Sequence, residues 1–276
     1  MKNATQNNQR EFSFSQENFR FLAGLAQART GIVLADHKKD MVYGRLTRRL
    51  RALNLDGFAE YCELLQSDAG ADEVGHLINA VTTNLTSFFR EAHHFDHLRD
   101  AVLPHVTGKK FRIWSSACSS GMEPYSIAMT MKQAIPDLAK WDAKILATDI
   151  DSNMLNIGRE GEYPAHELEE LPSQYKPYAK AGIKPGKLCV SDDLKKLITF
   201  NQLNLLEAWP MKGPFDAIFC RNVVIYFDKP TKQKLFARMA DILKPGGWLY
   251  IGHSENLHGI SDRFELFGRT IYRKVK

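Results

Sequence analysis

A short loop of small residues joins an apolar segment to an amphipathic one near the middle of the chain. The apolar segment is residues 111–114 (FRIW), the loop is residues 115–121 (SSACSSG), and residues 124–135 (PYSIAMTMKQAI) have helical character. In open α/β folds such a loop brings backbone amides and a helix amino terminus to the carboxyl edge of the sheet, where ligands bind. Because the loop contains only Gly121 of a GxGxxG fingerprint, a tight strand-to-helix turn explains it equally well.

Two acidic residues add chemistry to this edge. The next predicted strand lies in residues 144–151 (KILATDID) and ends at Asp149. At this position a carboxylate can accept hydrogen bonds from both hydroxyls of an adenosine ribose. It could instead cap the following helix, a role that Asp151 or Ser152 could fill equally well. Glu123 stands at the start of the helix after the loop, where the helix dipole favours an anion, and it could also reach a cationic ligand group.

The elements that would position these residues follow from periodicity. Up to about residue 81 the apolar residues recur with three-to-four spacing, which predicts a small all-helical module whose first helix stops at Gly31. From residue 111 onward short β-branched or aromatic runs alternate with amphipathic stretches. This alternation predicts a mostly parallel sheet with crossover helices. Residues 160–200 interrupt it with Pro, Gly and short β-like pieces, and we interpret them as an insertion.

Composition limits the class of protein. The chain has 276 residues, of which 44% are apolar and 25% charged, as in an ordinary globular protein. No apolar run reaches the ~18 residues that a membrane span requires, and the amino terminus has no signal-peptide core. The four cysteines contain no CxxC pair, so we expect reduced thiols, no disulfide, no metal and a cytoplasmic protein.

Residues 29–51 are strongly basic. On a helix at ~100° per residue, four of these side chains fall within one arc and apolar residues fall on the adjoining face. The four are Lys38, Arg45, Arg48 and Arg49. Such an arc is usually a solvated face; nucleic-acid binding is a sharper alternative, but interleaved aromatic residues and a base-reading motif are missing. An acidic protein surface as partner suits the arc better.

Longer segments resemble a known family. The turn LKPGG before an apolar strand, followed by a closing strand, looks like that of S-adenosylmethionine-dependent methyltransferases, whose last strands form a reversed hairpin. Six segments then resemble, in order, the chemotaxis receptor methyltransferases of the CheR family. They are VTTNLTSFFREAHHF (81–95), WSSACSSGMEPYSIA (114–128), ATDID (147–151), NLLE (204–207), PFDAIFCRNVVIYFDK (214–229) and LKPGGWLYIGHSEN (243–256).

The resemblance implies a fold and a reaction. The fold would be α/β, a Rossmann-like S-adenosylmethionine-dependent methyltransferase sheet in residues 86–276 with a small antiparallel β insertion at about 160–200. A small all-α domain, residues 1–85, would precede it and dock the receptor. The family's enzymes are protein-glutamate O-methyltransferases: S-adenosylmethionine donates a methyl group to glutamate side chains on the cytoplasmic helical bundle of chemoreceptors, which yields methyl esters and S-adenosylhomocysteine. The protein would then be a monomer recruited to receptor arrays, without nucleic-acid binding or membrane insertion.

The resemblance also implies site residues. Arg90 and Tyr226 would lie nearest the methyl transfer. The family's loop usually reads Gly-Glu-Glu-Pro, whereas Met122 replaces the first Glu here. If the first Glu makes the cofactor contact in the family, the assignment of that contact to Glu123 does not hold. The implied cofactor contacts are Asn84, Thr86, Arg90, Ala117, Glu123, Asp149, Asn204, Leu205, Asn222 and Val223.

The reaction itself predicts few catalytic groups. Methyl transfer from a sulfonium is an in-line displacement, so alignment and exclusion of water are the main requirements. A glutamate with a pKa near ~4.3 is already ionised at neutral pH, so no general base is needed. Tyr226 and Arg90 would supply a hydroxyl and a guanidinium fork that orient the carboxylate.

Several features keep an ordinary structural interpretation. Residues 82–90 (TTNLTSFFR) could cap helices and add core phenylalanines, although the resemblance places them over the adenosine. The insertion at 160–200 is either a surface excursion or the place where some relatives tether a receptor peptide. Among His93, His94 and His97, the first and last form an i, i+4 pair that could bind a metal, but no third ligand of suitable spacing is evident, and we interpret them as helix-surface and core residues. Cys118 and Cys220 lack a partner base and are interpreted as packing residues.

Overall fold

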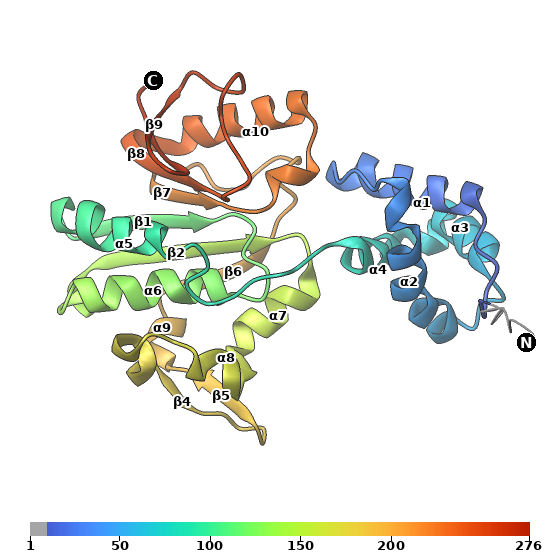
Figure 1. Cartoon of the computed structure of the whole chain (residues 1–276), viewed down its shortest axis with the longest axis horizontal. Coiled ribbons are helices and arrows are strands. Elements are labelled where there is room, and N and C mark those ends of the chain that lie inside the picture. Colours follow the sequence, from blue (N-terminus) through green and yellow to red (C-terminus); the bar gives the residue numbers. More distant parts are fainter. Residues whose placement is uncertain (1–9) are drawn as a thin grey trace, which may run out of the picture. The chain divides into compact units, whose positions relative to one another are not determined.

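The computed structural model of the chain describes residues 10–276. The chain divides into two compact units, one up to Thr82 and the other from Thr83 onward (Figure 1). Within residues 10–276 no helix combines the length and the apolar character needed to cross a lipid bilayer. The prediction that the amino terminus has no signal-peptide core concerns residues 1–9 in part, and these lie outside the described residues.

Between residue 10 and Thr82 the first unit has four α-helices around their own apolar core, as the sequence predicts. Ser15 caps the first helix, and Gly31 ends it in the left-handed conformation with φ of 73°. On the second helix Val42, Leu46 and Leu50 are fully buried at four-residue spacing, which confirms the predicted packing face. The helices are α1 (Gln16–Thr30), α2 (Lys39–Leu53), α3 (Phe58–Gln66) and α4 (Ala71–Val81).

The second unit is built on a seven-stranded sheet. The strand order is β6-β2-β1-β7-β8-β10-β9, and neighbouring strands are parallel except that β10 runs antiparallel to β8 and β9. The parallel sheet and the reversed closing hairpin are both confirmed. The strands are β1 (Lys110–Ser115), β2 (Asp142–Asp149), β6 (Ile198–Gln202), β7 (Phe215–Cys220), β8 (Leu243–Ile251), β9 (Phe264–Gly268) and β10 (Ile271–Lys274).

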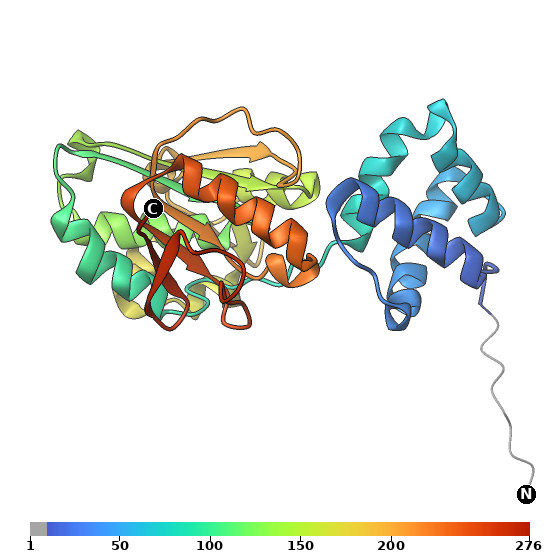
Figure 2. The same ribbon diagram turned by 90° about the horizontal axis from the view of Figure 1, so that it is seen from above.

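Helices cover both faces of this sheet because the central strands are apolar on both sides. On β1, Ile113 packs into the core under α5, α6 and α7, whereas Trp114 packs into the core under α10. Figure 2 shows α10 running across its face of the sheet. The helices are α5 (His93–His97), followed by the π-helical η3 (Leu98–Val102), then α6 (Met122–Ala134), α7 (Ser152–Glu160) and α10 (Lys229–Ile242).

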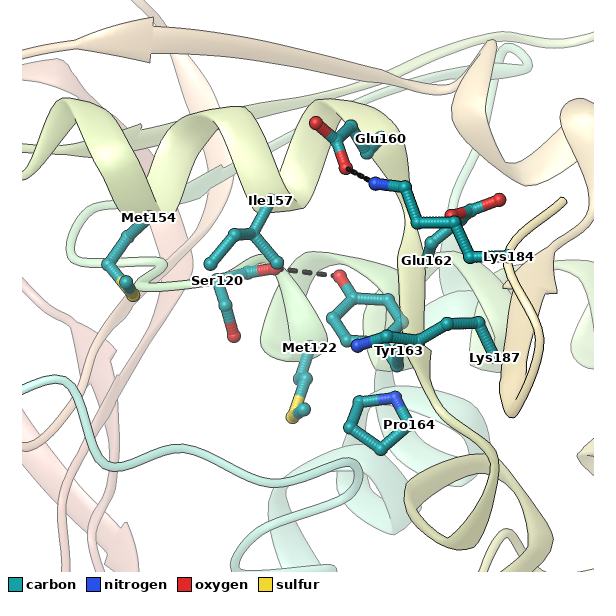
Figure 3. Close-up of a pocket in the computed structure, with 10 residues that line it drawn as sticks. All are labelled: Ser120, Met122, Met154, Ile157, Glu160, Glu162, Tyr163, Pro164, Lys184 and Lys187. Carbon is teal, nitrogen blue, oxygen red and sulfur yellow. Dashed lines mark hydrogen bonds and ion pairs between the residues drawn. The ribbon is translucent and has the colours of Figure 1, made fainter. Parts of the chain in front are cut away.

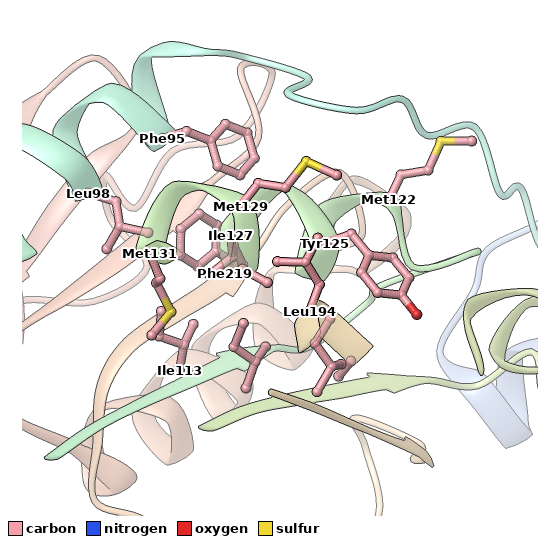
Figure 4. Close-up of a cluster of buried hydrophobic side chains, with 14 of the residues drawn as sticks. Phe95, Leu98, Ile113, Met122, Tyr125, Ile127, Met129, Met131, Leu194 and Phe219 are labelled. Atoms are coloured by element: carbon pink, nitrogen blue, oxygen red, sulfur yellow. The ribbon is translucent and has the colours of Figure 1, made fainter. Parts of the chain in front are cut away.

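Helix α6 is enclosed on every side. Each residue from Met122 to Met131 is buried, and Figure 4 shows its side chains meeting Phe95 and Leu98 above and Ile113 and Phe219 of the sheet. Burial on all sides fits its three methionines, because their flexible side chains fill irregular space between two layers. The helix that follows the small-residue loop is therefore held rigidly.

The segment at 160–200 forms the predicted antiparallel insertion. Its three strands pair in the order β3-β5-β4. Tyr163 of β3 is buried and donates a hydrogen bond from its hydroxyl to the carbonyl of Ser120 at 2.7 Å, so the insertion is tied to the small-residue loop. The elements are β3 (Glu162–Pro164), α8 (Ala165–Glu169), β4 (Ala179–Ala181), β5 (Lys187–Val190) and α9 (Asp192–Lys195).

Candidate active site

Four loops at the carboxyl ends of β1, β2, β6 and β7 carry most of the predicted site residues. Because these strands are parallel, their carboxyl ends meet at one edge of the sheet. The order reverses at β1, which lies between β2 and β7, so the edge includes a topological switch point, the usual place for a ligand in such folds. The predicted residues at this edge are Asp149, the last residue of β2, Glu123 in the first turn of α6, and Ala117, Asn204, Leu205, Asn222, Val223 and Tyr226 in the connecting segments.

The loop at 115–121 is small partly for structural reasons. Gly121 has φ of +88°, and a Cβ there would lie 2.9 Å from the Cα of Gly158 on α7. The amides of Ser116, Cys118 and Ser119 donate to protein acceptors on the neighbouring strands. A loop with these amides already engaged is not a phosphate cradle, which argues against a dinucleotide and is compatible with a nucleoside that carries no phosphate.

Asp149 is held at the end of β2 by backbone donors. Its Oδ2 accepts from the amide of Ser119 at 2.7 Å and its Oδ1 from the amide of Asp151 at 2.9 Å. Asp151, and not Asp149, caps α7, so the alternative role as a helix cap does not apply to Asp149. Burial raises the pKa of Asp149 to about 6, although the backbone hydrogen bonds oppose the shift.

The segment that follows the helical unit lies against this edge. The side-chain amide of Asn84 donates to Asp151 Oδ2 at 2.7 Å, and the Ser119 hydroxyl donates to the Asn84 carbonyl at 3.0 Å. Phe88 and Phe89 pack against the core beneath α6, as an ordinary structural interpretation predicts. Thr86 is half-buried in the same segment. Asn84 thus lies next to the loops of β1 and β2.

A buried ionic network lies behind these loops. The Arg221 guanidinium is 2% exposed and donates to Glu123 Oε2 at 2.9 Å, and it lies 3.4 Å from Glu91 Oε2. The other Glu123 oxygen accepts from the Ser115 hydroxyl at 2.7 Å. Each oxygen of Glu123 thus has one partner inside the protein and can accept a further hydrogen bond, so its predicted cofactor contact stays a prediction.

Glu91 extends the network to the loops of β7 and β8. Its Oε1 accepts from Asn222 Nδ2 at 3.3 Å and from the ring of His253 at 3.0 Å. Burial alone would raise the pKa of Glu91, but Arg221 and the hydrogen bonds from His253 and Asn222 outweigh it and lower the pKa to about 2. Glu91 is consequently ionised at neutral pH and pairs with the arginine.

Arg90 stands in a constrained segment between these groups. Phe89 and Glu91 on either side of it have φ of 52° and 58°, a conformation that is costly for side chains of this kind. The Arg90 carbonyl accepts from Arg221, and its guanidinium donates to the Leu85 carbonyl at 2.8 Å. Within residues 10–276 it forms no ion pair with a carboxylate. The guanidinium thus keeps donors available at the site edge.

The loops of β6 and β7 supply the remaining predicted residues. Asn204 accepts from the amide of Leu206 at 3.0 Å and so shapes the turn in which Leu205 is buried. Asn222 adopts φ of 58° and Val223 is half-buried. Tyr226 ends the short helix η7 (Val224–Tyr226), and its ring is half-buried against the core beneath α10.

Sequence reasoning missed three buried charged residues: Arg221, Glu91 and Glu255. Their partners lie far away in the chain, as in the pairing of Arg221 with Glu91 and Glu123. Periodicity does not reveal such pairs. The sequence feature that could have revealed them is a charged residue within an otherwise apolar or motif-bearing segment, because a charged side chain that is buried there requires a partner.

The histidines and cysteines have packing roles. His94 is buried with Nε2 2.9 Å from the Thr270 hydroxyl, and His97 Nδ1 lies 3.0 Å from the Tyr250 hydroxyl. Burial raises the pKa of Cys118 and of Cys220 well above the ordinary range, which keeps both thiols protonated and unreactive. In the part of the chain from residue 10 on, no three or more His, Cys, Asp or Glu side chains cluster as metal ligands.

The basic residues of the first unit have unequal roles. Arg49 forms a two-pronged ion pair with the buried Glu73, with Nε to Oε1 at 2.7 Å, and Arg45 donates to the carbonyls of Ala80 and Thr82 at the end of α4. Both are thus engaged inside their own domain. Arg48 on α2 and Lys38, in the turn just before it, are exposed.

Two hollows of the second unit are lined by none of the predicted site residues. One, of about 330 Å³, is formed by Ser120, Met122, α7 and the β insertion (Figure 3). The other, of about 540 Å³, lies at the opposite, amino edge of the sheet beside Lys110 and Trp248. Neither includes Asp149 or Arg90. The chemistry of the side chains, and not the size of a hollow, therefore assigns the site to the carboxyl edge.

The fold and this edge together define a class of protein. A seven-stranded sheet with a reversed final hairpin, a buried acid at the end of the second strand and a loop without a phosphate cradle fits S-adenosylmethionine, a nucleoside cofactor without phosphate. The class is that of the S-adenosylmethionine-dependent methyltransferases.

Comparison with known proteins identifies the family. The model of the CheR methyltransferase S-adenosylmethionine-binding domain matches residues 84–273, and that of the CheR all-alpha domain matches residues 17–82. The chain is 50% identical over 252 residues to a probable chemotaxis protein methyltransferase of Rhizobium etli, covering 88% of this chain and 94% of that protein. It is 46% identical to the chemotaxis protein methyltransferases of Salmonella typhimurium (96% and 92% covered) and Escherichia coli (96% and 93% covered). The chain belongs to the CheR methyltransferase family.

The raised pKa of Asp149 gives a first prediction. The prediction that Asp149 binds both ribose hydroxyls requires its ionised carboxylate, the form that predominates above a pH of about 6. We expect the affinity for S-adenosylhomocysteine to fall about tenfold between pH 7 and pH 5. Titration calorimetry at both values measures it. Asp149→Asn, which does not titrate, should bind more weakly with no such slope; an equal slope in both proteins would contradict the assignment.

Proposed function

We propose that the protein is a protein-glutamate O-methyltransferase that transfers the methyl group of S-adenosylmethionine to glutamate side chains of chemoreceptors and so serves adaptation in chemotaxis. Its relatives named chemotaxis protein methyltransferases support this role. The observation that carries the proposal is Arg90, a half-buried guanidinium without a carboxylate partner within residues 10–276, which donates to the Leu85 carbonyl and whose own carbonyl accepts from Arg221 at the end of β7. A guanidinium with free donors suits the carboxylate of a substrate side chain.

The residues of the chain have positioning roles in this reaction. S-adenosylmethionine supplies a methyl group on a positively charged sulfur. Arg90 and the Tyr226 hydroxyl orient the substrate carboxylate, which is ionised without a general base. Asp149 accepts from the ribose, while Asn84, Thr86, Ala117, Asn204, Leu205, Asn222 and Val223 surround the nucleoside. Glu123 contacts the cofactor in this proposal, and it also pairs with Arg221, whose guanidinium donates to the Arg90 carbonyl.

Base lability of the product tests the proposed function. The protein is incubated with methyl-labelled S-adenosylmethionine and either receptor cytoplasmic fragments or nucleic acid. We expect label on the receptor that mild base releases, because a carboxyl methyl ester hydrolyses readily. Base-stable label on nucleic acid, or no transfer to either substrate, would overturn the proposal.

We further propose that the helical domain docks the receptor in the cytoplasm, at the receptor array, through its exposed cations. Lys38 and Arg48 are the members of the predicted arc that are free to do so, since Arg45 and Arg49 are engaged inside the domain. Opposite charge on an acidic receptor helix would speed the encounter and would be screened by salt.

Charge reversal at Arg48 tests this docking role. Arg48→Glu is expected to raise the KM for receptor several-fold at low salt, and less at high salt, while the affinity for S-adenosylhomocysteine stays constant. The matched control is Lys234→Glu on α10, an exposed position with the same change in net charge. Equal KM values for the two variants would contradict docking through Arg48. Arg49 is not a suitable test site, because its reversal would leave the buried Glu73 without its partner.

A further inference from the structure

A buried carboxylate outside the predicted site holds the loop that carries part of it. Glu255 follows β8 and is 6% exposed. Its Oε2 accepts from the amides of Gly252 at 2.6 Å and Asn222 at 3.1 Å, and its Oε1 accepts from the amides of Val224 at 3.0 Å and Ile225 at 3.3 Å. One side chain thus satisfies four backbone donors, three of them in the loop after β7.

Two of these donors, the amides of Val224 and Ile225, are of the kind that a helix start leaves without partners. The short helix η7 begins at Val224, and no local side chain caps it. Its first amides therefore need an acceptor from elsewhere, and Glu255 supplies it from a position about thirty residues away in the sequence. A carboxylate is the appropriate group, because it only accepts hydrogen bonds and its charge strengthens each of them.

The backbone at Gly252 packs closely against the same loop. A Cβ at Gly252 would lie 2.4 Å from Asn222 Nδ2, 2.8 Å from the Asn222 amide nitrogen and 2.9 Å from Glu255 Oε2. Asn222 itself is in the left-handed conformation, with φ of 58°. The loop therefore has little room to shift, and its unusual conformation depends on contacts with residues 252 and 255.

We propose that Glu255 is a positioning residue for methyl transfer: by binding the amides at 222, 224 and 225 it fixes Asn222 and Val223 against the nucleoside and sets the place of Tyr226 at the end of η7. The inference rests on the proposed function, because it assigns Tyr226 to the reacting end of the site. Glu255 itself touches neither cofactor nor substrate. It acts through the backbone of the loop, where a displacement of about 1 Å can cost about 100-fold in rate.

The isosteric variant Glu255→Gln tests the inference. Glutamine places an NH₂ group where two backbone amides also donate, so one pair of hydrogen bonds is lost at nearly constant shape. We expect kcat to fall about 10- to 100-fold while the KM for receptor changes less than about twofold. Amide hydrogen exchange of peptides covering residues 221–227 should accelerate at least about tenfold, in the presence and absence of S-adenosylhomocysteine. Gly252→Ala should give the same pattern by displacing the same loop.

Controls separate a positioning role from a merely structural one. Glu265→Gln on β9 removes the charge of an exposed glutamate and should leave kcat and exchange unchanged. Glu255→Asp keeps the charge but shortens the reach, so it should recover part of kcat; it also carries the test if Glu255→Gln does not fold. Unchanged exchange at 221–227, or faster exchange spread evenly over the second unit, would overturn the inference.

The exchange measurement does not depend on the receptor reaction. If the wild-type protein transferred no methyl group to receptor, the proposed function would fail. The local effect of Glu255→Gln on residues 221–227 and on the affinity for S-adenosylhomocysteine would still be measurable. If receptor methylation were normal and exchange unaltered, the positioning role alone would fail.

Discussion

Arg90→Ala is expected to lower the rate of methyl transfer to receptor by about 10²- to 10³-fold and to weaken the binding of S-adenosylhomocysteine. The reason is that a fixed donor aimed at reacting charge contributes most where water is excluded. The guanidinium forms a hydrogen bond to the Leu85 carbonyl and stands between two residues in strained conformations, so its position is set before substrate binds. Steady-state kinetics with receptor fragments and titration calorimetry measure the two effects.

Tyr226→Phe provides the comparison within the same site. It removes one hydroxyl from a half-buried ring and should reduce kcat about tenfold, with cofactor affinity unchanged. Arg99→Ala serves as a control for the loss of an arginine, because Arg99 pairs with the exposed Asp96 and Asp100 away from the site. Normal turnover in both Arg90→Ala and Tyr226→Phe would remove these two residues from the catalytic assignment.

Arg221→Met should strongly destabilise the second unit. It would leave Glu91 and Glu123 buried without the guanidinium that neutralises them. Breaking a buried ion pair from one side typically costs about 3–5 kcal/mol of unfolding free energy. It would also release the contact with the Arg90 carbonyl, so cofactor affinity should fall as well. Urea denaturation monitored by circular dichroism gives the free energy.

Arg99→Met is the matched control for this measurement. Arg99 also bridges two carboxylates, but Asp96 and Asp100 are 56% and 63% exposed, against 10% and 11% for Glu91 and Glu123. Surface pairs contribute about 0–1 kcal/mol, so this variant should unfold almost as the wild type does. A similar loss in the two variants would mean that the buried network does not stabilise the site.

Sequence patterns with a short period predicted the fold well. Spacings of two and of three to four predicted the helical unit and the parallel sheet, and Pro and Gly residues marked the insertion at 160–200. The reversed hairpin and the antiparallel pairing of the insertion were predicted from the family resemblance instead. Ser15 caps the start of α1 and Gly31 ends it, and both are local sequence signals for the ends of a helix. These features depend on neighbours in the chain, or on which face of an element is apolar, and both can be read from one segment at a time.

The roles of individual charged side chains were less predictable. Arg45, Arg48 and Arg49 fall within one arc of α2, yet α4 engages Arg45 and Arg49 and leaves Arg48 exposed. The glycine at position 121 was interpreted from its place at the ligand-binding edge, but the structure shows that the close approach of Gly158 also excludes a side chain there. Each outcome depends on a partner that only the folded chain brings near, and no periodicity records it.

The position of a bound nucleoside tests the central claim most directly. A crystal structure of the complex with S-adenosylhomocysteine should place the ribose hydroxyls within hydrogen-bond distance of Asp149 and the sulfur on the side of Arg90 and Tyr226. Density for the compound in the hollow beside Trp248 at the amino edge, with Asp149 free of it, would contradict the assignment of the active site to the carboxyl edge of the sheet.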